Sequence, residues 1–325
     1  MKTSRSGGDG WFRVFLGVFP VLVLAIVVGI GIALFSESIL SIRRFGINFW
    51  FTDVWDPVPH GNALTGQFGA KPFIWGTLYS SILALLIAGP ISLGIATYLS
   101  ELCPPKLRQP LIFLTELLAA IPSIVYGLWG VFVLVPLVRQ LEVHTPESWR
   151  QFPLFSGPPL GLGMLSAALI LAIMVTPFIS SLAREVLKAV PRTQREGAYA
   201  LGATQWEAIR VALSYGRTGI IGAIMLGFGR ALGETMAVTM VIGNNPRVSW
   251  SLFAPQYTMA AVIANEFTEA ADELHLHALI EIGLVLFIIT LFVNALSRLL
   301  IWSMNKQAVA RPKTKLEPAK IGSAA

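Results

Sequence analysis

The sequence predicts an all-α, polytopic membrane protein with six transmembrane helices. Of its 325 residues, 54% are hydrophobic and 13% are charged, and the mean hydropathy is +0.68. A soluble domain would carry about 25% charged residues. A spanning helix needs about 20 consecutive apolar residues to cross a hydrocarbon core about 30 Å thick. Six stretches meet this requirement, at 14–35, 73–99, 110–138, 159–183, 216–243 and 276–302.

The distribution of lysine and arginine predicts the orientation of these spans. The chain has 24 such residues. One of them, Arg230, lies within a span, and six lie in segments on the outer side: Arg43, Arg44, Lys71, Arg139, Arg150 and Arg247. The remaining seventeen lie on the side of the N-terminus. Cytoplasmic loops are enriched in these cations, so both termini are expected in the cytoplasm.

The net charge of +6 requires no nucleic acid as a partner. Cations in the inner loops, facing anionic lipid headgroups, account for it. The first apolar run is longer than the roughly 7–15 residues of a signal-peptide core, which favours a retained helix. The small residues Gly31 and Ala33 leave cleavage after this run as the alternative.

The chain divides into a cytoplasmic N-terminus (1–13), a first helix (14–35) and an aromatic-rich outer segment (36–72). A transmembrane domain of five helices (73–305) and a flexible cytoplasmic tail (306–325) follow. Because aromatic rings favour the membrane interface, the outer segment is expected to lie along the outer leaflet.

The apolar stretch Gly227–Gly243 contains two charged residues, Arg230 and Glu234. Each charge at the middle of a span costs at least about 2.5–3.5 kcal/mol, so such a pair indicates a functional site. The spacing of four places both residues on one helix face. They could form an internal ion pair that joins helices or a charged element of a polar path. Thr235 and Thr239 could add hydroxyls to that path or bond to the helix backbone.

The inner segment at about 188–215, between the fourth and fifth spans, is too long for a simple connection and has a helical period of its own. Its apolar residues recur at steps of three or four, which predicts one amphipathic helix; they are Tyr199, Gly202, Trp206, Ile209 and Leu213. Such a helix could lie on the membrane or dock into a groove of a partner protein. The small residues Gly202 and Ala203 give a compact surface, which favours a protein partner.

The same segment resembles the "EAA" loop of ABC importer permeases. The resemblance rests on Glu196-Gly197-Ala198, on Gly202 after three intervening residues, and on the apolar helix that follows. It implies that the loop couples the chain to an ATP-hydrolysing subunit, with the contact formed by Glu196, Gly197, Ala198, Gly202, Trp206 and Ile209. The typical loop ends in Leu-Pro, whereas here Leu213 precedes Ser214, so the joint to the next span is expected to differ.

Three further segments resemble the PstC-type permeases of bacterial phosphate importers: Phe68–Leu78, Ala119–Pro136 and Gly229–Thr239. The sister PstA-type permeases share the Gly-Glu-Thr core but differ after it. The resemblance extends over about 36–305 and implies the type I ABC importer permease fold. It also implies that Arg230 and Glu234 help to move phosphate, and that the partners are a PstA-type permease, a PstB-type ATPase dimer and a PstS-type phosphate-binding protein.

The sequence indicates a transport subunit rather than an enzyme. It has no Gly-x-x-x-x-Gly-Lys-Ser/Thr loop to hold nucleotide phosphates, and no catalytic residues, cofactor or metal are expected. Its single cysteine and the isolated pair His275 and His277 give no metal-ligand cluster. The alternatives are an importer of another oxyanion, such as molybdate or sulfate, and a stand-alone secondary transporter. The docking segment argues against the latter, because a self-sufficient carrier has no use for it.

Overall fold

The computed structural model describes residues 7–57 and 66–309. Within these ranges the elements are helices apart from one short hairpin, which pairs β1 (Trp55–Asp56) with β2 (Gln67–Phe68), and loops connect them. The first half contains α1 (Gly7–Glu37), α2 (Ile39–Phe45), η1 (Gly46–Trp50), α3 (Lys71–Thr97), the π-helical η2 (Tyr98–Leu102), α4 (Pro105–Ala120), α5 (Ser123–Trp129), the π-helical η3 (Gly130–Leu134) and α6 (Val135–His144). The second half contains α7 (Glu147–Arg150), α8 (Met164–Lys188), α9 (Arg192–Ala200), α10 (Gln205–Leu232), α11 (Met236–Val241), α12 (Met259–Glu266) and α13 (Glu273–Val309).

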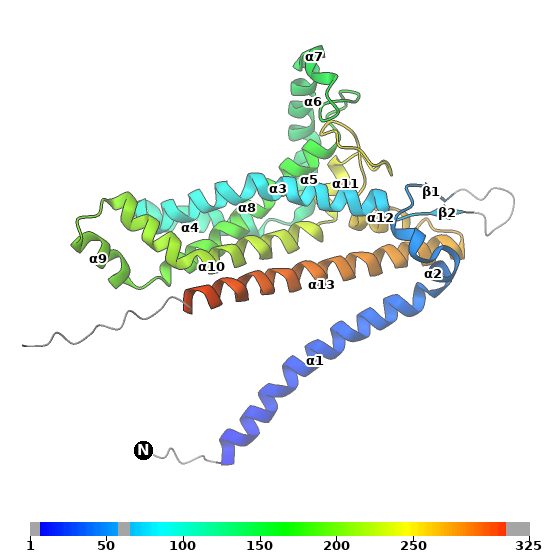
Figure 1. The fold of residues 1–325 in the computed structure, drawn as a ribbon. Coiled ribbons are helices and arrows are strands. Elements are labelled where there is room, and N and C mark those ends of the chain that lie inside the picture. Colours follow the sequence, from blue (N-terminus) through cyan, green and yellow to red (C-terminus); the bar gives the residue numbers. More distant parts are fainter. Residues whose placement is uncertain (1–6, 58–65, 310–325) are drawn as a thin grey trace, which may run out of the picture.

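The helices α3, α8, α10 and α13 form an elongated bundle, with α9 at one end and the hairpin at the other (Figure 1). The most extensive packing joins α3 to α8. Helix α1 leaves this bundle and contacts α13 only near its hairpin end, where Gly31 faces Phe287. Its apolar side chains are otherwise exposed, as expected for a helix surrounded by lipid or a partner subunit.

Six helical segments of the described residues are long and apolar enough to span a membrane, which confirms the predicted number. They are Phe15–Glu37, Lys71–Leu102, Ser123–His144, Met164–Lys188, Gln205–Leu232 and Glu273–Ser303. The third differs from the predicted stretch 110–138, because the helix breaks at Pro122. Proline has no N–H and disfavours a helical conformation in the residue before it, and Ile121 is extended.

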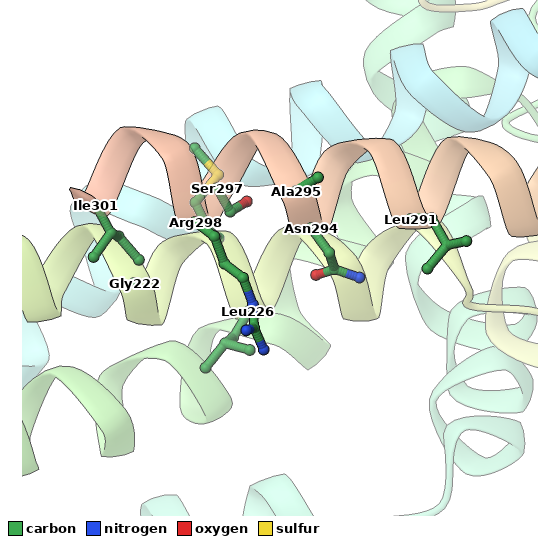
Figure 2. Close-up of a pocket in the computed structure, with 9 residues that line it drawn as sticks. Gly222, Leu226, Leu291, Asn294, Ala295, Ser297, Arg298 and Ile301 are labelled. Atoms are coloured by element: carbon green, nitrogen blue, oxygen red, sulfur yellow. The ribbon is translucent and has the colours of Figure 1, made fainter. Parts of the chain in front are cut away.

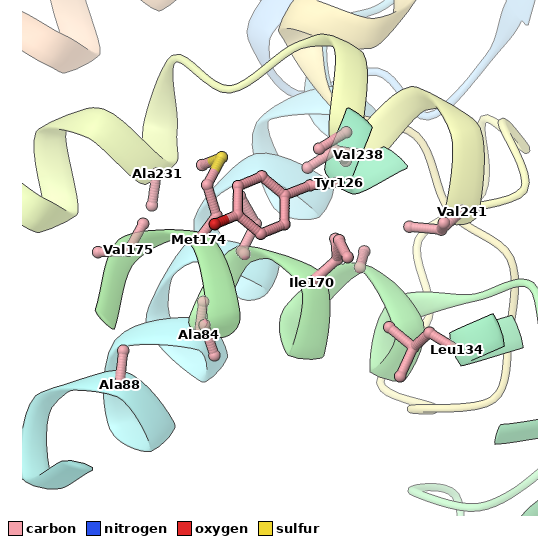
Figure 3. Packing of buried hydrophobic residues seen from close by; sticks show 14 of the residues in the cluster. Ala84, Ala88, Tyr126, Leu134, Ile170, Met174, Val175, Ala231, Val238 and Val241 are labelled. Carbon is pink, nitrogen blue, oxygen red and sulfur yellow. The ribbon is translucent and has the colours of Figure 1, made fainter. Parts of the chain in front are cut away.

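The break after α4 is stabilised by Tyr126, whose hydroxyl donates a hydrogen bond of 2.7 Å to the carbonyl of Leu118. This bond satisfies one of the carbonyls that a helix end leaves free. Beyond the break the chain leaves the bundle axis, and α6 and α7 project to the side (Figure 1). The ring of Tyr126 packs among side chains of α8 and α11, including Ile170, Met174 and Val238 (Figure 3).

The outer segment folds against the hairpin end of the bundle. Phe49 and Phe68 are buried together with Phe73, Tyr257 and residues of α13. These rings therefore pack within the chain, whereas Ile47 and Phe51 remain exposed; the position of the segment along the outer leaflet stays a prediction. A cluster shared with α13 buries more apolar area than a surface position would. At the other end α13 continues to Val309, and the rest of the predicted tail lies outside the described residues.

Candidate functional site

Arg230 lies in the last turn of α10, where a cation interacts favourably with the negative end of the helix dipole. Its side chain is exposed, and its guanidinium carbon lies 5.3 Å from the centre of the Phe178 ring of α8. One aromatic ring of a neighbouring helix thus lies beside this exposed cation.

Glu234 lies beyond the end of this helix. The structure contradicts the predicted continuous helix over 216–243, because α10 ends at Leu232 and α11 begins at Met236. Gly233 caps α10, and the Glu234 carboxylate accepts a hydrogen bond of 3.3 Å from the backbone N–H of Ala237, in the first turn of α11. A carboxylate is favourable at that position, because the free N–H groups and the helix dipole attract it.

The two charges therefore do not share a helix face. Across residues 7–57 and 66–309, no ion pair joins Arg230 to Glu234. An internal pair that holds helices together has no support in this geometry. What remains is an exposed cation beside a break in the helix. Irregular backbone at membrane depth is tolerated where it is buried in protein or lines a polar cavity.

The hydroxyls of the two threonines in this region donate hydrogen bonds to backbone carbonyls. Thr239 donates a bond of 2.8 Å to the carbonyl of Thr235, and Thr235 donates one of 3.4 Å to the carbonyl of Gly233. Of the two alternatives for these residues, the backbone role is the one present here. The hydroxyl oxygens still have lone pairs, which can accept hydrogen bonds but cannot donate one to an anion.

The predicted docking segment folds as two helices rather than one. Helix α9 ends at Ala200, Gly202 has a φ of +80° in the turn, and α10 begins after Thr204. Gly is favoured at such a φ because it has no Cβ. Thr204 and Glu207 form a capping box: the Glu207 N–H donates to the Thr204 hydroxyl at 3.4 Å, and the Thr204 N–H donates to the Glu207 carboxylate at 2.8 Å.

Because of this break, the residues predicted to contact the ATPase do not all lie on one exposed surface. Glu196, Gly197, Gly202 and Trp206 are exposed at the α9 end, and Ala198 is half-buried. Ile209 is only 3% exposed and packs within this chain. A face shared by Gly202, Trp206 and Ile209 is therefore wrong, because the turn at Gly202 interrupts the helical period. Leu201, which the period did not select, is 90% exposed in that turn.

A groove of about 660 Å³ lies between α10 and α13. Asn294 and Arg298 extend from α13 toward α10 there (Figure 2), and the rest of the lining is mainly apolar. None of the residues predicted for the substrate path lines this groove. Sequence reasoning did not select Asn294, although a polar side chain in an apolar span is a visible signal.

The histidines near the hairpin end bond to protein groups. His275 Nε2 lies 3.1 Å from the Glu266 carboxylate, and His277 contacts the backbone carbonyl of Glu37. Among the residues that the structure describes, no group of three or more potential metal ligands occurs. That no metal is needed stays a prediction.

The family model "Binding-protein-dependent transport system inner membrane component" matches residues 91–306, which is more than half of the chain. The chain belongs to this family. Its members are permease subunits of ABC transporters and not enzymes.

Similar proteins cover almost the whole chain. The protein named "Phosphate transport system permease protein PstC" of Mesorhizobium japonicum is 44% identical, over 93% of this chain and 92% of its own length. The protein of that name from Haemophilus influenzae is 46% identical, over 92% and 94%. A "Probable phosphate transport system permease protein PstC" of Methanocaldococcus jannaschii is 40% identical, over 85% and 88%.

A solved structure supports the fold independently. It is described as "Inward facing conformations of the MetNI methionine ABC transporter: CY5 native crystal form", and it matches with a TM-score of 0.53. The match covers 71% of this chain and 94% of that chain at 17% identity. At this identity the likeness shows the fold alone, which is that of a type I ABC importer permease.

Proposed function

We propose that the chain is the channel-forming permease subunit of an ATP-driven importer of inorganic phosphate. The observation that carries the proposal is the exposed guanidinium of Arg230 at the break between α10 and α11. Within the described residues it forms no ion pair with an acidic side chain. Phosphate carries one to two negative charges and several acceptor oxygens, and a guanidinium matches two of those oxygens with parallel N–H groups. The names of the similar permeases favour phosphate among the possible anions.

The break gives the anion a place to be bound briefly. Arg230 attracts it, and the nearby Glu234 carboxylate, with its negative charge, keeps the attraction from becoming too strong. Passage requires binding that is favourable enough for entry and weak enough for release. The protein's own part is thus to hold one cation at the end of α10 and one anion at the start of α11.

The family supports the assembly that we propose. The proposed complex contains a PstA-type permease, a PstB-type ATPase dimer and a PstS-type phosphate-binding protein, in the inner membrane with both termini in the cytoplasm. The exposed turn of α9 and α10, with Tyr199, Leu201, Gly202 and Trp206, is the proposed contact with the ATPase. Its large apolar side chains would otherwise face water.

Reconstitution tests the proposal. The four subunits are placed in vesicles with ATP on the ATPase side, and uptake of labelled phosphate is measured with and without competing molybdate or sulfate. We expect uptake that depends on ATP and on the binding protein and resists both competitors. Uptake inhibited by one competitor at equal concentration would assign the complex to that oxyanion. Uptake by this chain without the ATPase would establish a stand-alone transporter instead.

A further inference from the structure

The guanidinium of Arg195, on α9, forms a two-point ion pair with Glu101 of η2. Its Nε lies 3.0 Å from one carboxylate oxygen of Glu101, and its Nη2 lies 2.6 Å from the other. The Arg195 side chain is 19% exposed and that of Glu101 is 11% exposed. Paired planar groups of this kind fix orientation as well as distance, and partial burial protects them from screening by salt.

The same guanidinium also binds the end of α8. Nη2 donates a hydrogen bond of 2.9 Å to the carbonyl of Leu187, and Nη1 donates one of 3.0 Å to the carbonyl of Val190. Leu187 lies in the last turn of α8, where carbonyls lack helical partners. One side chain of α9 is thus bonded to the ends of two bundle helices, α3 through η2 and α8 directly.

Apart from the short connection at 189–191, α9 is joined directly to those two helices mainly by these bonds. No residue of α9 is buried, and its extensive packing is with α10, which in turn packs on α8 and α3. Helices α3 and α8 form the most extensive contact in the described chain. A displacement of α9 can therefore reach the α3–α8 pair directly through the Arg195 bonds, and indirectly through α10.

Glu101 is itself held in place and lies in an unusual turn. The Ser100 hydroxyl donates a bond of 2.9 Å to its carboxylate. The turn Tyr98–Leu102 is π-helical, and the Cys103 N–H bonds to the carbonyl of Tyr98 at 2.8 Å. Such turns are wider than α-helical ones and occur often at functional positions. This one sits where α3 meets the docking helix.

We infer that Arg195 and Glu101 form the mechanical link that transmits movement of the docked α9 to α3 and α8. Arg195 is a positioning residue: it touches neither substrate nor ATP and acts through the helices that it joins. The inference rests on the proposed function, because it needs an ATPase that moves α9. It adds that transport and ATP hydrolysis are coupled within this chain by one charge pair, which lies outside the motif residues of the docking segment.

The test uses the four-subunit complex in vesicles and measures three quantities for each variant: ATPase subunit bound, ATP hydrolysed and phosphate taken up. Arg195→Gln and Glu101→Gln are expected to keep the ATPase bound and hydrolysing. The phosphate taken up per ATP should fall by about tenfold, within the range of typical coupling energies. Lys188→Gln is the matched control. It removes one positive charge at the same end of the bundle, from an exposed pair with Glu185, and should leave the ratio unchanged.

Arg195→Lys and the reversed pair Arg195→Glu with Glu101→Arg guard against variants that fail to assemble. Lysine keeps the charge but cannot make the two-point contact or reach the carbonyls of both Leu187 and Val190. The lysine variant should therefore assemble and still lower the phosphate taken up per ATP. The reversed pair should assemble and regain part of the phosphate taken up per ATP. An unchanged ratio in both Arg195→Gln and Arg195→Lys would overturn the inference. If only the variants that do not assemble lose uptake, the pair is structural and the inference also fails.

The wild-type complex separates this inference from the proposed function. If it takes up no phosphate, the proposed function fails, and stimulation of ATP hydrolysis by the binding protein then serves as the readout of coupling. Stimulation that survives in Arg195→Gln overturns the link in that case, and its selective loss supports the link. If wild type takes up phosphate and the variants keep the same phosphate taken up per ATP, the link through Arg195 fails and the proposed function stands.

Discussion

Arg230 faces the ring of Phe178, with its guanidinium carbon 5.3 Å from the ring centre. A contact of this kind contributes about 0.5–2 kcal/mol, depending on exposure. It keeps the arginine in place without neutralising its charge, as a carboxylate would. The cation at the break between α10 and α11 is therefore available to an incoming anion at small cost.

Replacing Arg230 by glutamine is expected to lower phosphate uptake by about 10- to 100-fold, since a hydrogen bond to a charged group contributes about 1.5–3 kcal/mol. Lysine should restore part of the loss, because it keeps the charge but not the paired donors. Initial uptake rates in vesicles measure the effect. Arg217→Gln, on the same helix and also exposed, should transport normally. Equal losses in both variants would mean that the general charge of α10 matters rather than this position.

The separation of Arg230 from Glu234 makes a prediction about the double variant. Were they a buried ion pair, removing either partner would strand a charge at a cost of about 3–5 kcal/mol, and removing both would restore assembly. Because they are not paired here, both single glutamine variants should assemble, and the double variant should remain deficient in uptake. Co-purification and uptake measure the two properties. Normal uptake in the double variant would establish a structural pair.

The number of spans, the charged element and the exposed docking segment could be predicted because each depends on local composition. The helix breaks at Pro122 and Gly233 were missed, because hydropathy remains high across both. Pro122 is a signal that sequence reasoning can use. Gly233 is a weaker one, since glycine also occurs inside membrane helices for close packing. The start of α11 is stabilised there by the Ala237 N–H, which donates a hydrogen bond to the Glu234 carboxylate.

The docking segment shows how a periodic pattern can mislead. Tyr199 and Trp206 are seven residues apart and would share a face of one helix, yet a turn separates them. Two signals were available: Gly202 as a helix terminator and Thr204-x-x-Glu207 as a capping box. The Arg195–Glu101 pair had none, because its members are 94 residues apart in the chain. Only the folded arrangement brings them together, through the ion pair that joins α9 to η2.

Trp206→Ala is expected to weaken the association with the ATPase by at least about tenfold, as the loss of a large ring from the centre of an interface usually does. The side chain is 57% exposed, so the stability of the isolated chain should change little. Binding of the purified ATPase to the chain in detergent measures the association. Trp149→Ala, with a ring 55% exposed on the projecting α7, is the control. Unchanged binding in the Trp206 variant would move the docking surface elsewhere.

Gly202→Val tests the turn that positions this surface. The φ of +80° costs a residue with a Cβ about 1–2 kcal/mol, although open space surrounds the position. We expect weaker ATPase binding with a normal amount of chain in the membrane. Gly202→Asn is the control, because asparagine adds a side chain at the same place but adopts a left-handed backbone more readily than valine. Equal effects of the two substitutions would point to bulk on the surface rather than to backbone strain.

Thr204→Ala removes the cap of α10 and should destabilise its first turn by about 0.5–2 kcal/mol. Serine at this position keeps the hydroxyl that accepts the Glu207 N–H, and should retain most of the stability. Protection of the backbone amides at the start of α10 against hydrogen exchange measures the change locally. Faster exchange in alanine but not in serine is the expected result. If hydrogen exchange is unchanged in the alanine variant, packing against α9, not the cap, stabilises the start of α10.

Gly227 and Gly229 test how closely α10 must approach α8. A Cβ at Gly227 would overlap the side chain of Ile179 and lie 3.1 Å from Val175, whereas one at Gly229 would lie 3.8 Å from Asn294, an ordinary contact. Gly227→Ala should therefore lower the free energy of unfolding by about 1–3 kcal/mol through overpacking. Gly229→Ala should be neutral or stabilising, since alanine is the better helix former. Thermal unfolding of the purified chain in detergent compares them.

A second substitution decides whether overpacking is the cause. Ile179→Val removes a methyl group on the facing helix, and in the Gly227→Ala background it should recover part of the lost stability. In the wild-type background the same change should cost about 0.5–1.5 kcal/mol. A cost in both backgrounds would mean that the overlap is relieved by movement of α10 instead. Since Arg230 lies one turn beyond Gly227, such a movement would displace the cation, and uptake would fall while the chain stayed folded.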